Sequence, residues 1–275
     1  MLKKLLKYDL RSVFRFWWIA VIICTSLSIV AGISQLVSSY DGWMPQVFTA
    51  ISDGAIFLAY CSYFALMVLM LVLLFIRFFK NFFSDEGYLT FTLPVSRKQL
   101  LNSKVITGFI GMTASAAVCG VNLLIMSAIS RSTDFENGSF FAPIIEYIAD
   151  GTKELGIYFW IYMAEGVTLA LIFLALVVLF LYFCITFGSM IVKKGKLIAS
   201  IAIFYGASSI FTAIVQFLLI FGSIGFLVSL DPGTTLNEDP LLALFLLGLI
   251  FYLSMLSCLL YALQYRMLDK KLNLA

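Results

Sequence analysis

The 275-residue chain contains no histidine, and only 12% of its residues are charged. Histidine is the commonest general base near neutral pH and the commonest neutral metal ligand, so its absence removes the usual centre of acid–base or metal chemistry. The five cysteines each stand alone in apolar stretches, without a C-x-x-C pair. This spacing is typical of small buried apolar side chains. The sequence also lacks a phosphate-binding G-x-x-x-x-G-K-[ST] loop, so the chain itself is not expected to hydrolyse ATP.

What the sequence has in excess is apolar residues, which make up 62% of it, against about 45 to 50% in soluble domains. A helix that crosses the ~30 Å hydrocarbon core of a membrane needs about 20 apolar residues. Six stretches satisfy this length and predict an all-α polytopic membrane protein with a single transmembrane domain, residues 1–275. The predicted spans are about 17–37, 54–79, 105–129, 157–192, 197–229 and 241–264.

Charges are distributed unequally between the two sides of these spans. Sixteen of the eighteen basic residues lie at the two termini or in the loops on the same side, and only Arg131 and Lys153 fall opposite. Because basic loops remain in the cytoplasm, this predicts a multi-pass protein of the cytoplasmic membrane with both termini inside. The outer loops hold ten acidic residues: Asp41, Asp53, Asp134, Glu136, Glu146, Asp150, Glu154, Asp231, Glu238 and Asp239.

The N-terminal arm, residues 1–16, has the pattern of an amphipathic helix. At 100° per residue its five basic residues share one arc and its leucines lie opposite. Such a helix lies in the membrane interface, with its lysines near anionic headgroups, and would form an elbow before the first span. A secretory signal peptide is the competing interpretation, but no small-x-small cleavage site stands out. Asp9 interrupts the apolar arc, and the sequence does not indicate which residue it would pair with.

Residues 80–104 form the most polar run of the chain and lie between the second and third predicted spans, on the cytoplasmic side. Gly87 permits a tight turn, Pro94 ends any helix before it, and Ser96 with Gln99 fits a capping box at the start of a new helix. One interpretation is a solvated turn whose charges only fix the topology. The exposed apolar side chains in "DEGYLTFTLP" favour a second, in which a partner covers the loop.

The run Glu86-Gly87, Leu93-Pro94-Val95-Ser96-Arg97 and Lys104 resembles the intracellular loop of the type-two permeases of bacterial ATP-binding cassette exporters. The elbow helix, the six spans and a polar interruption before the sixth agree with the layout of that family, although this chain lacks the large extracellular domain of its bigger members. The resemblance implies a permease half that pairs with an identical copy or a relative and exports an amphipathic peptide, drug-like molecule or lipid.

The same resemblance implies that ATP and Mg are bound by a separate ATPase subunit, which docks on a short coupling helix within residues 84–92. No cofactor on this chain, no enzymatic activity of its own and no nucleic-acid partner are expected. The implied coupling residues are Asp85, Glu86, Gly87, Tyr88, Leu89, Pro94 and Arg97.

Two features inside the spans are candidates for a substrate pathway. Glu165 is the only acid well within a span, where a carboxylate is costly and therefore a functional candidate, unless it snorkels to the outer water. On the fifth span Tyr205, Ser208, Thr212 and Gln216 form a polar stripe that either lines a path or joins helices by hydrogen bonds. The third span carries a small-residue face, Gly111, Ser115 and Cys119, that predicts close helix packing.

Two other functions compete with the permease. An ion-coupled secondary transporter would have paired carboxylates or broken helices in two related halves, and the sequence shows no internal repeat. An intramembrane enzyme would need clustered His, Glu, Ser or Asp at one depth.

Gly222 and Gly225 are possible break points in the long fifth segment, which is either a simple span or a helix that dips back into the outer leaflet.

Overall fold

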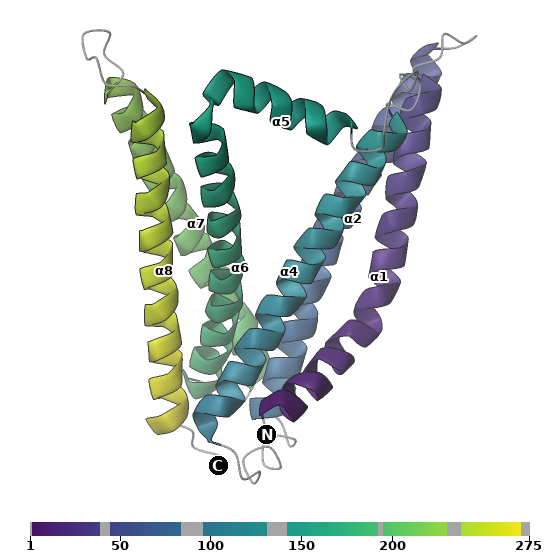
Figure 1. The fold of residues 1–275 in the computed structure, drawn as a ribbon. Helices are drawn as coiled ribbons and strands as arrows, with labels where there is room; N and C mark the ends of the chain where they lie inside the picture. The colour runs from purple at the N-terminus through teal and green to yellow at the C-terminus, as the bar shows by residue number, and fades with distance from the viewer. Residues whose placement is uncertain are drawn as a thin grey trace. The chain divides into compact units, whose positions relative to one another are not determined.

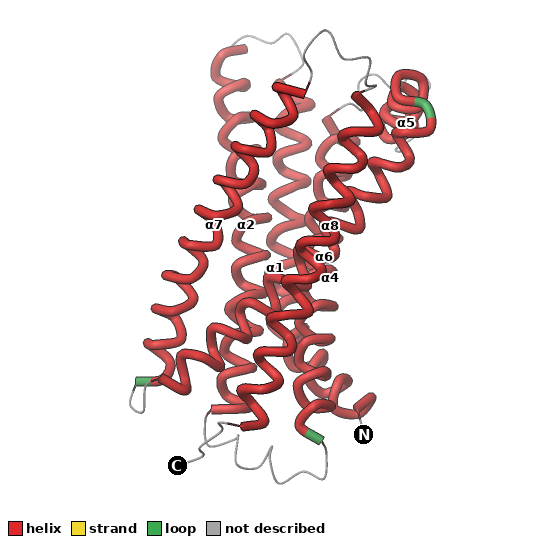
Figure 2. Tube along the Cα trace, turned by 90° about the vertical axis from the view of Figure 1, so that its left-hand side faces the viewer, coloured by secondary structure: helices red, strands yellow, loops and turns green. Residues whose placement is uncertain are grey.

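The computed structural model describes residues 2–38, 45–83, 96–130, 142–191, 195–229 and 238–270. Within these ranges every residue is helical except 96, 156 and 195, and no strand occurs, as Figure 2 shows. The prediction of an all-α protein is therefore confirmed. The helices are α1 (Leu2–Ser38), α2 (Pro45–Phe83), α4 (Arg97–Ser130), α5 (Ala142–Leu155), α6 (Ile157–Ile191), α7 (Lys196–Ser229) and α8 (Glu238–Lys270) (Figure 1).

Five of these helices, α1, α2, α4, α6 and α8, are long and apolar enough to cross a membrane. The protein is thus a membrane protein with several spans. In α7 the apolar stretch among the described side chains, Leu197–Ile210, is shorter. The α7 backbone nevertheless remains helical through Gly222 and Gly225, so the helix does not break at these glycines. Residues 230–237, where the predicted polar interruption falls, lie outside the described residues.

The chain divides into two compact units. Unit 1 comprises Met1–Leu74 and Ile106–Gly156, and unit 2 comprises Phe75–Val105 and Ile157–Ala275. The division falls inside α2 and inside α4, each of which is a continuous helix. Both helices therefore contribute one part to each unit, and the residues that flank the loop at 84–95 belong to unit 2.

Unit 1 is held together by a seam of buried polar contacts between α1, α2 and α4. The indole Nε1–H of Trp17 donates a hydrogen bond to the Ser115 hydroxyl (2.8 Å), which joins α1 to α4. The hydroxyls of Ser28 and Tyr63 share a hydrogen bond of 2.8 Å, which joins α1 to α2. Because lipid offers no competing water, such contacts between apolar helices are worth about 0.6 to 2 kcal/mol each.

The small-residue face of α4 packs closely, as its sequence predicts. A Cβ added to Gly111 would lie 1.7 Å from the Met70 Cε of α2, so the end of that flexible side chain packs directly on the glycine and would have to move. One turn further, Ser115 accepts the bond from Trp17 and donates its own hydroxyl to the Gly111 carbonyl (3.0 Å). Trp17 is buried, whereas its neighbour Trp18 is exposed.

The expected elbow segment and the first expected span form one uninterrupted helix, α1. In Figure 1 the first, dark purple turns of α1 run at an angle to the rest of the helix. The side chains of Lys3, Lys7, Arg11 and Arg15 are exposed, whereas Val13 on the opposite arc is buried. The amphipathic pattern read from the sequence is therefore present in the structure. Asp9 is buried but makes an electrostatic or hydrogen-bonding contact, so it is not without a partner.

Unit 2 is built on α6, which packs against both α8 and α7. At its C-terminal end α6 approaches the start of α7 so closely that a Cβ on Gly188 would lie 2.6 Å from the Ser200 Cα. The Ser200 hydroxyl donates to the Ile185 carbonyl (3.3 Å) across the same contact. A glycine without a side chain is thus what lets the two backbones approach each other here.

We predict that Gly188→Ala destabilises the protein, because the contacting atoms are backbone atoms that cannot move independently. Overpacking of this kind costs about 1 to 3 kcal/mol. Gly206→Ala on α7 is the matched control, since no atom lies within 4 Å of the added Cβ. Thermal unfolding of the detergent-solubilised variants should show a lower Tm for Gly188→Ala alone. A Tm for Gly188→Ala equal to that of the parent would contradict the close contact between α6 and α7.

Candidate functional site

The predicted coupling loop lies outside the described residues for most of its length. Asp85, Glu86, Gly87, Tyr88, Leu89 and Pro94 all fall in the stretch 84–95. The structure does describe where the loop ends: α2 ends at Phe83 and α4 begins at Arg97. The Ser96 hydroxyl accepts a hydrogen bond from the Gln99 amide (3.4 Å), and its carbonyl accepts from the Leu100 amide (3.1 Å). Ser96 is therefore the N-cap of α4, as the capping pattern predicts.

Tyr182 of α6 contacts both helices that flank this loop. Its ring stacks on Phe78 of α2, with ring centroids 4.2 Å apart and an interplanar angle of 12°. Its hydroxyl donates to the Lys104 carbonyl of α4 (3.3 Å). Phe78 and Tyr182 are almost completely buried, so the stack adds about 0.5 to 1.5 kcal/mol to the burial of the two rings. One side chain of α6 thus fastens the last turns of α2 and the first turns of α4.

A second contact fastens α4 to α8. The Tyr261 hydroxyl donates a short hydrogen bond to the Asn102 Oδ1. Asn102, Ser103 and Lys104 form one turn near the start of α4, and the last two are buried. The flanks of the loop are therefore attached to α6 and to α8 within unit 2.

Glu165, the first pathway candidate, is buried in unit 2 with only 7% of its surface exposed. Its Oε2 is fully buried and has no hydrogen-bond partner in the part of the chain that the structure describes. This oxygen is therefore not at the surface of the described residues. A buried polar atom without a hydrogen-bond partner costs about 1 to 3 kcal/mol, and more if it is charged. Glu165 is therefore expected to lower the free energy of unfolding of the protein.

The four residues of the second candidate lie along α7. Tyr205 is 76% exposed, and Thr212 and Gln216 are also exposed. The Ser208 and Thr212 hydroxyls each donate to a carbonyl of the same helix, at 2.8 Å. These two hydroxyls therefore donate their hydrogen bonds within α7. The stripe and Glu165 lie on different helices, and no contact between them is recorded.

Two buried amides were missed by the sequence interpretation. Asn122 of unit 1 is fully buried, donates to the Cys24 sulfur (3.5 Å) and leaves its Oδ1 without a partner among the described residues. Gln264 of unit 2 is also fully buried, and neither of its amide atoms has a partner there. The sequence could have pointed to both residues, because an amide side chain inside a long apolar segment is unusual in a membrane span. Such residues often serve function or helix packing.

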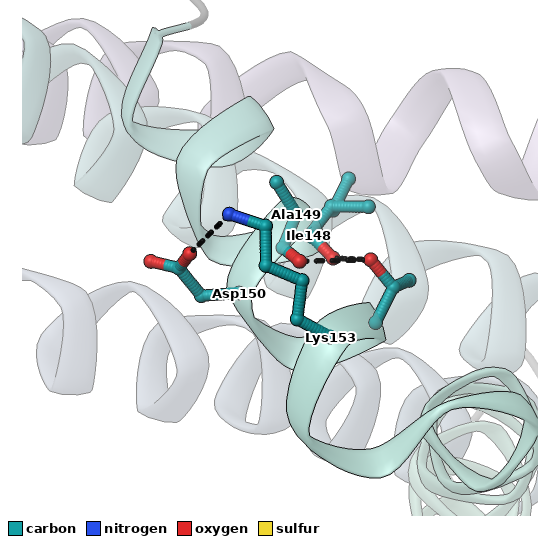
Figure 3. A network of polar contacts seen from close by, with 5 residues as sticks. Ile148, Ala149, Asp150 and Lys153 are labelled. Atoms are coloured by element: carbon teal, nitrogen blue, oxygen red, sulfur yellow. Dashed lines mark hydrogen bonds and ion pairs between the residues drawn. The ribbon is translucent and has the colours of Figure 1, made fainter.

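The segment between α4 and α6 contains a separate helix, α5. Figure 3 shows how it is stabilised: Lys153 reaches Asp150 at 3.4 Å, and the Thr152 hydroxyl donates to the carbonyls of Ile148 and Ala149. Both charged groups are exposed, so the ion pair contributes little. Gly156, with φ of 57°, ends the helix and donates its amide to the Thr152 carbonyl (3.1 Å).

Comparison of the chain with models of known protein families, with curated protein sequences and with solved structures finds no match. Among the described residues, no group of three or more His, Cys, Asp or Glu lies together in a way that would hold a metal ion. The fold and the site therefore define a multi-spanning membrane protein with a buried, partly unpartnered carboxyl at Glu165 and a loop whose two flanking helices are both attached to α6 or α8. Its activity has to be inferred from these features.

We predict that Glu165→Gln leaves the Tm of the protein unchanged or raises it. The substitution removes a buried charge without breaking a hydrogen bond at Oε2. Ser115→Ala serves as the contrast, because it leaves the Trp17 indole unpaired and should cost about 1 to 3 kcal/mol. Thermal unfolding in the same detergent measures both variants. A large loss of Tm for Glu165→Gln would mean that the carboxyl is needed for folding.

Proposed function

We propose that this chain is the permease subunit of an ATP-binding cassette exporter, which moves an amphipathic peptide, drug-like molecule or lipid across the cytoplasmic membrane. ATP and Mg would be bound by a separate ATPase subunit that docks on residues 84–92. The proposal includes six spans, with α7 as the fifth, and both termini in the cytoplasm. The first turns of α1 would lie in the cytoplasmic interface as the elbow, where their exposed basic residues meet anionic headgroups.

The observation that carries this proposal is the attachment of the loop's flanks. Phe78 and Lys104, on the two sides of the loop, both contact Tyr182, and Asn102 contacts Tyr261. A force applied to the loop by a docked subunit would therefore reach α6 and α8 directly. A loop that served only to fix topology would need no such attachment. The same two flanking helices continue without a break into unit 1, so the force would reach it through the backbone.

The exposed stripe on α7 supports a second copy or a relative as partner. Tyr205, Thr212 and Gln216 are exposed within a predicted span, and polar side chains at that depth face protein or a water-filled cavity more often than lipid. A pathway at the contact between two permease subunits would satisfy this constraint. The stripe would then face the pathway or the partner permease.

Docking of the ATPase is tested by removing the loop side chains that would touch it. With the cognate ATPase, sought in the neighbouring reading frame, Glu86→Ala and Tyr88→Ala should each weaken the complex by about tenfold or more. Asp150→Ala and Tyr147→Ala are matched controls on α5, which would lie outside the membrane in the proposed topology. Affinity would be measured by co-purification and by titration of the ATPase. Undiminished binding by both loop variants would rule out the coupling role.

Transmission from the loop is tested separately, with the docking residues intact. Tyr182→Leu removes both the stack on Phe78 and the bond to Lys104, so the complex should form while the permease-dependent part of ATP turnover falls about tenfold. Tyr182→Phe retains the stack on Phe78, so its permease-dependent ATP turnover should fall much less. The permease-dependent part is the difference between the steady-state ATP turnover of the complex and that of the ATPase alone. Equal turnover for Tyr182→Leu and the parent would show that α6 does not transmit the motion.

A further inference from the structure

One exposed face of α1 changes from basic to apolar within a single turn. Four side chains are spaced at i, i+4, i+7 and i+11 and therefore share this face: Arg11, Arg15, Trp18 and Ile22. All four are exposed, Trp18 at 58% and Ile22 at 66%. We call this set the α1 stripe. It presents two guanidinium groups directly next to an exposed apolar surface.

The apolar half of the α1 stripe indicates how deep the arginines lie. The helix is long and apolar enough to cross a membrane, so its exposed apolar side chains face lipid acyl chains. A charged group is costly among acyl chains, whereas tryptophan is enriched at the level of the headgroups. The change from Arg15 to Trp18 therefore marks the boundary between headgroups and acyl chains, and both arginines lie on the headgroup side.

Packing inside unit 1 supports the exposed ring at this boundary. The Trp18 ring contacts the Trp17 ring nearly edge-on, with centroids 5.1 Å apart and an interplanar angle of 68°. Trp17 is buried, and its indole is bonded to Ser115 of α4. A side chain that is supported in this way loses less conformational entropy when a ligand covers it.

The two guanidinium groups of the α1 stripe are not neutralised by the protein. Neither Arg11 nor Arg15 makes an ion pair in the part of the chain that the structure describes. Asp9, the only acid of α1, is buried on the opposite face. Lys7, one turn before Arg11, is also exposed and adds a further positive charge. The stripe therefore attracts an anion.

The two halves of the α1 stripe together indicate the kind of anion. Guanidinium groups donate paired N–H bonds to phosphate oxygens, which makes them specific for phosphate groups. A free phosphate would use these donors but leave the apolar half uncovered. A phospholipid uses both halves, with its phosphate at Arg11 and Arg15 and an acyl chain along Trp18 and Ile22. A choline headgroup would bring its own positive charge to the arginines, so a lipid with net negative charge is favoured.

We propose that the α1 stripe is a binding site for an anionic phospholipid, such as phosphatidylglycerol. The site extends the interfacial position that the proposed function gives to the first turns of α1. It requires neither an ATPase nor a particular orientation in the membrane, because a nanodisc offers the lipid in both leaflets. The two proposals can therefore fail separately.

The test uses the purified full chain in phosphatidylcholine nanodiscs that contain a small fraction of phosphatidylglycerol with a photoreactive acyl chain. After irradiation, peptide mapping by mass spectrometry should find the label on α1 near Trp18 and Ile22. Unlabelled phosphatidylglycerol should reduce this labelling, whereas the same amount of added phosphatidylcholine or glycerol 3-phosphate should not. Equal competition by phosphatidylcholine would show that only the acyl chain is recognised, and equal competition by glycerol 3-phosphate would show a site for free anions. Either result would overturn the proposal.

Substitutions then assign the selectivity to the two arginines. Arg11→Gln and Arg15→Gln should each lower the apparent affinity for phosphatidylglycerol, measured by this competition, by about fivefold. Lys153→Gln is the matched control, because it removes one exposed positive charge from α5, and its affinity should stay within about twofold of the parent. High salt should reduce the preference of the parent for phosphatidylglycerol over phosphatidylcholine.

Two results with these variants would contradict the inference. Unchanged affinity in both arginine variants would mean that the guanidinium groups do not hold the lipid. An equal loss in Lys153→Gln would assign the effect to the net charge of the protein. If instead the lipid binds as expected while Glu86→Ala and Tyr88→Ala leave the ATPase complex intact, the lipid site stands and the proposed transport function fails.

Discussion

The structure of unit 2 depends on one side chain, Tyr182, which touches α2 with its ring and α4 with its hydroxyl. These helices are the two flanks of the loop at 84–95, so Tyr182 makes the ends of that loop part of the packed core of α6. Burial of the two stacked rings supplies most of the stabilisation of this contact, and the hydrogen bond of the hydroxyl fixes the orientation of the ring. Under the proposed function, this contact is the route by which a subunit docked on the loop would act on α6.

Polar side chains are rare in this chain, and the structure uses them in two ways. In unit 1 they join helices: Trp17, Ser28 and Tyr63 each find a partner on another helix, which is how polar groups lower their cost in lipid. Asn122 of unit 1 and Glu165 and Gln264 of unit 2 are instead buried with polar atoms that have no partner among the described residues. Groups of the first kind contribute to stability. Groups of the second kind reduce it, and a protein retains them where they serve binding or movement.

Much of the fold could be predicted because hydropathy and capping are local signals. All six apolar segments are helical, and Ser96 caps α4 as its spacing to Gln99 indicates. Burial was harder to predict, because it depends on neighbours distant in sequence. Trp17 and Trp18 are adjacent and chemically identical, yet one faces Ser115 and the other is exposed. Glu165 stood out in the sequence, but only the structure shows that its oxygen is unpartnered. The pairing of Tyr182 with both flanks of the loop has no sequence signal.

The central claim is that a separate ATPase grips the loop between α2 and α4, and cross-linking tests it most directly. A photoreactive residue at position 88 should give a cross-linked adduct with the ATPase in membranes that contain both proteins, and the same residue at position 147 of α5 should give none. An adduct from position 147 but not from position 88, or from neither position although the complex is intact, would contradict the account.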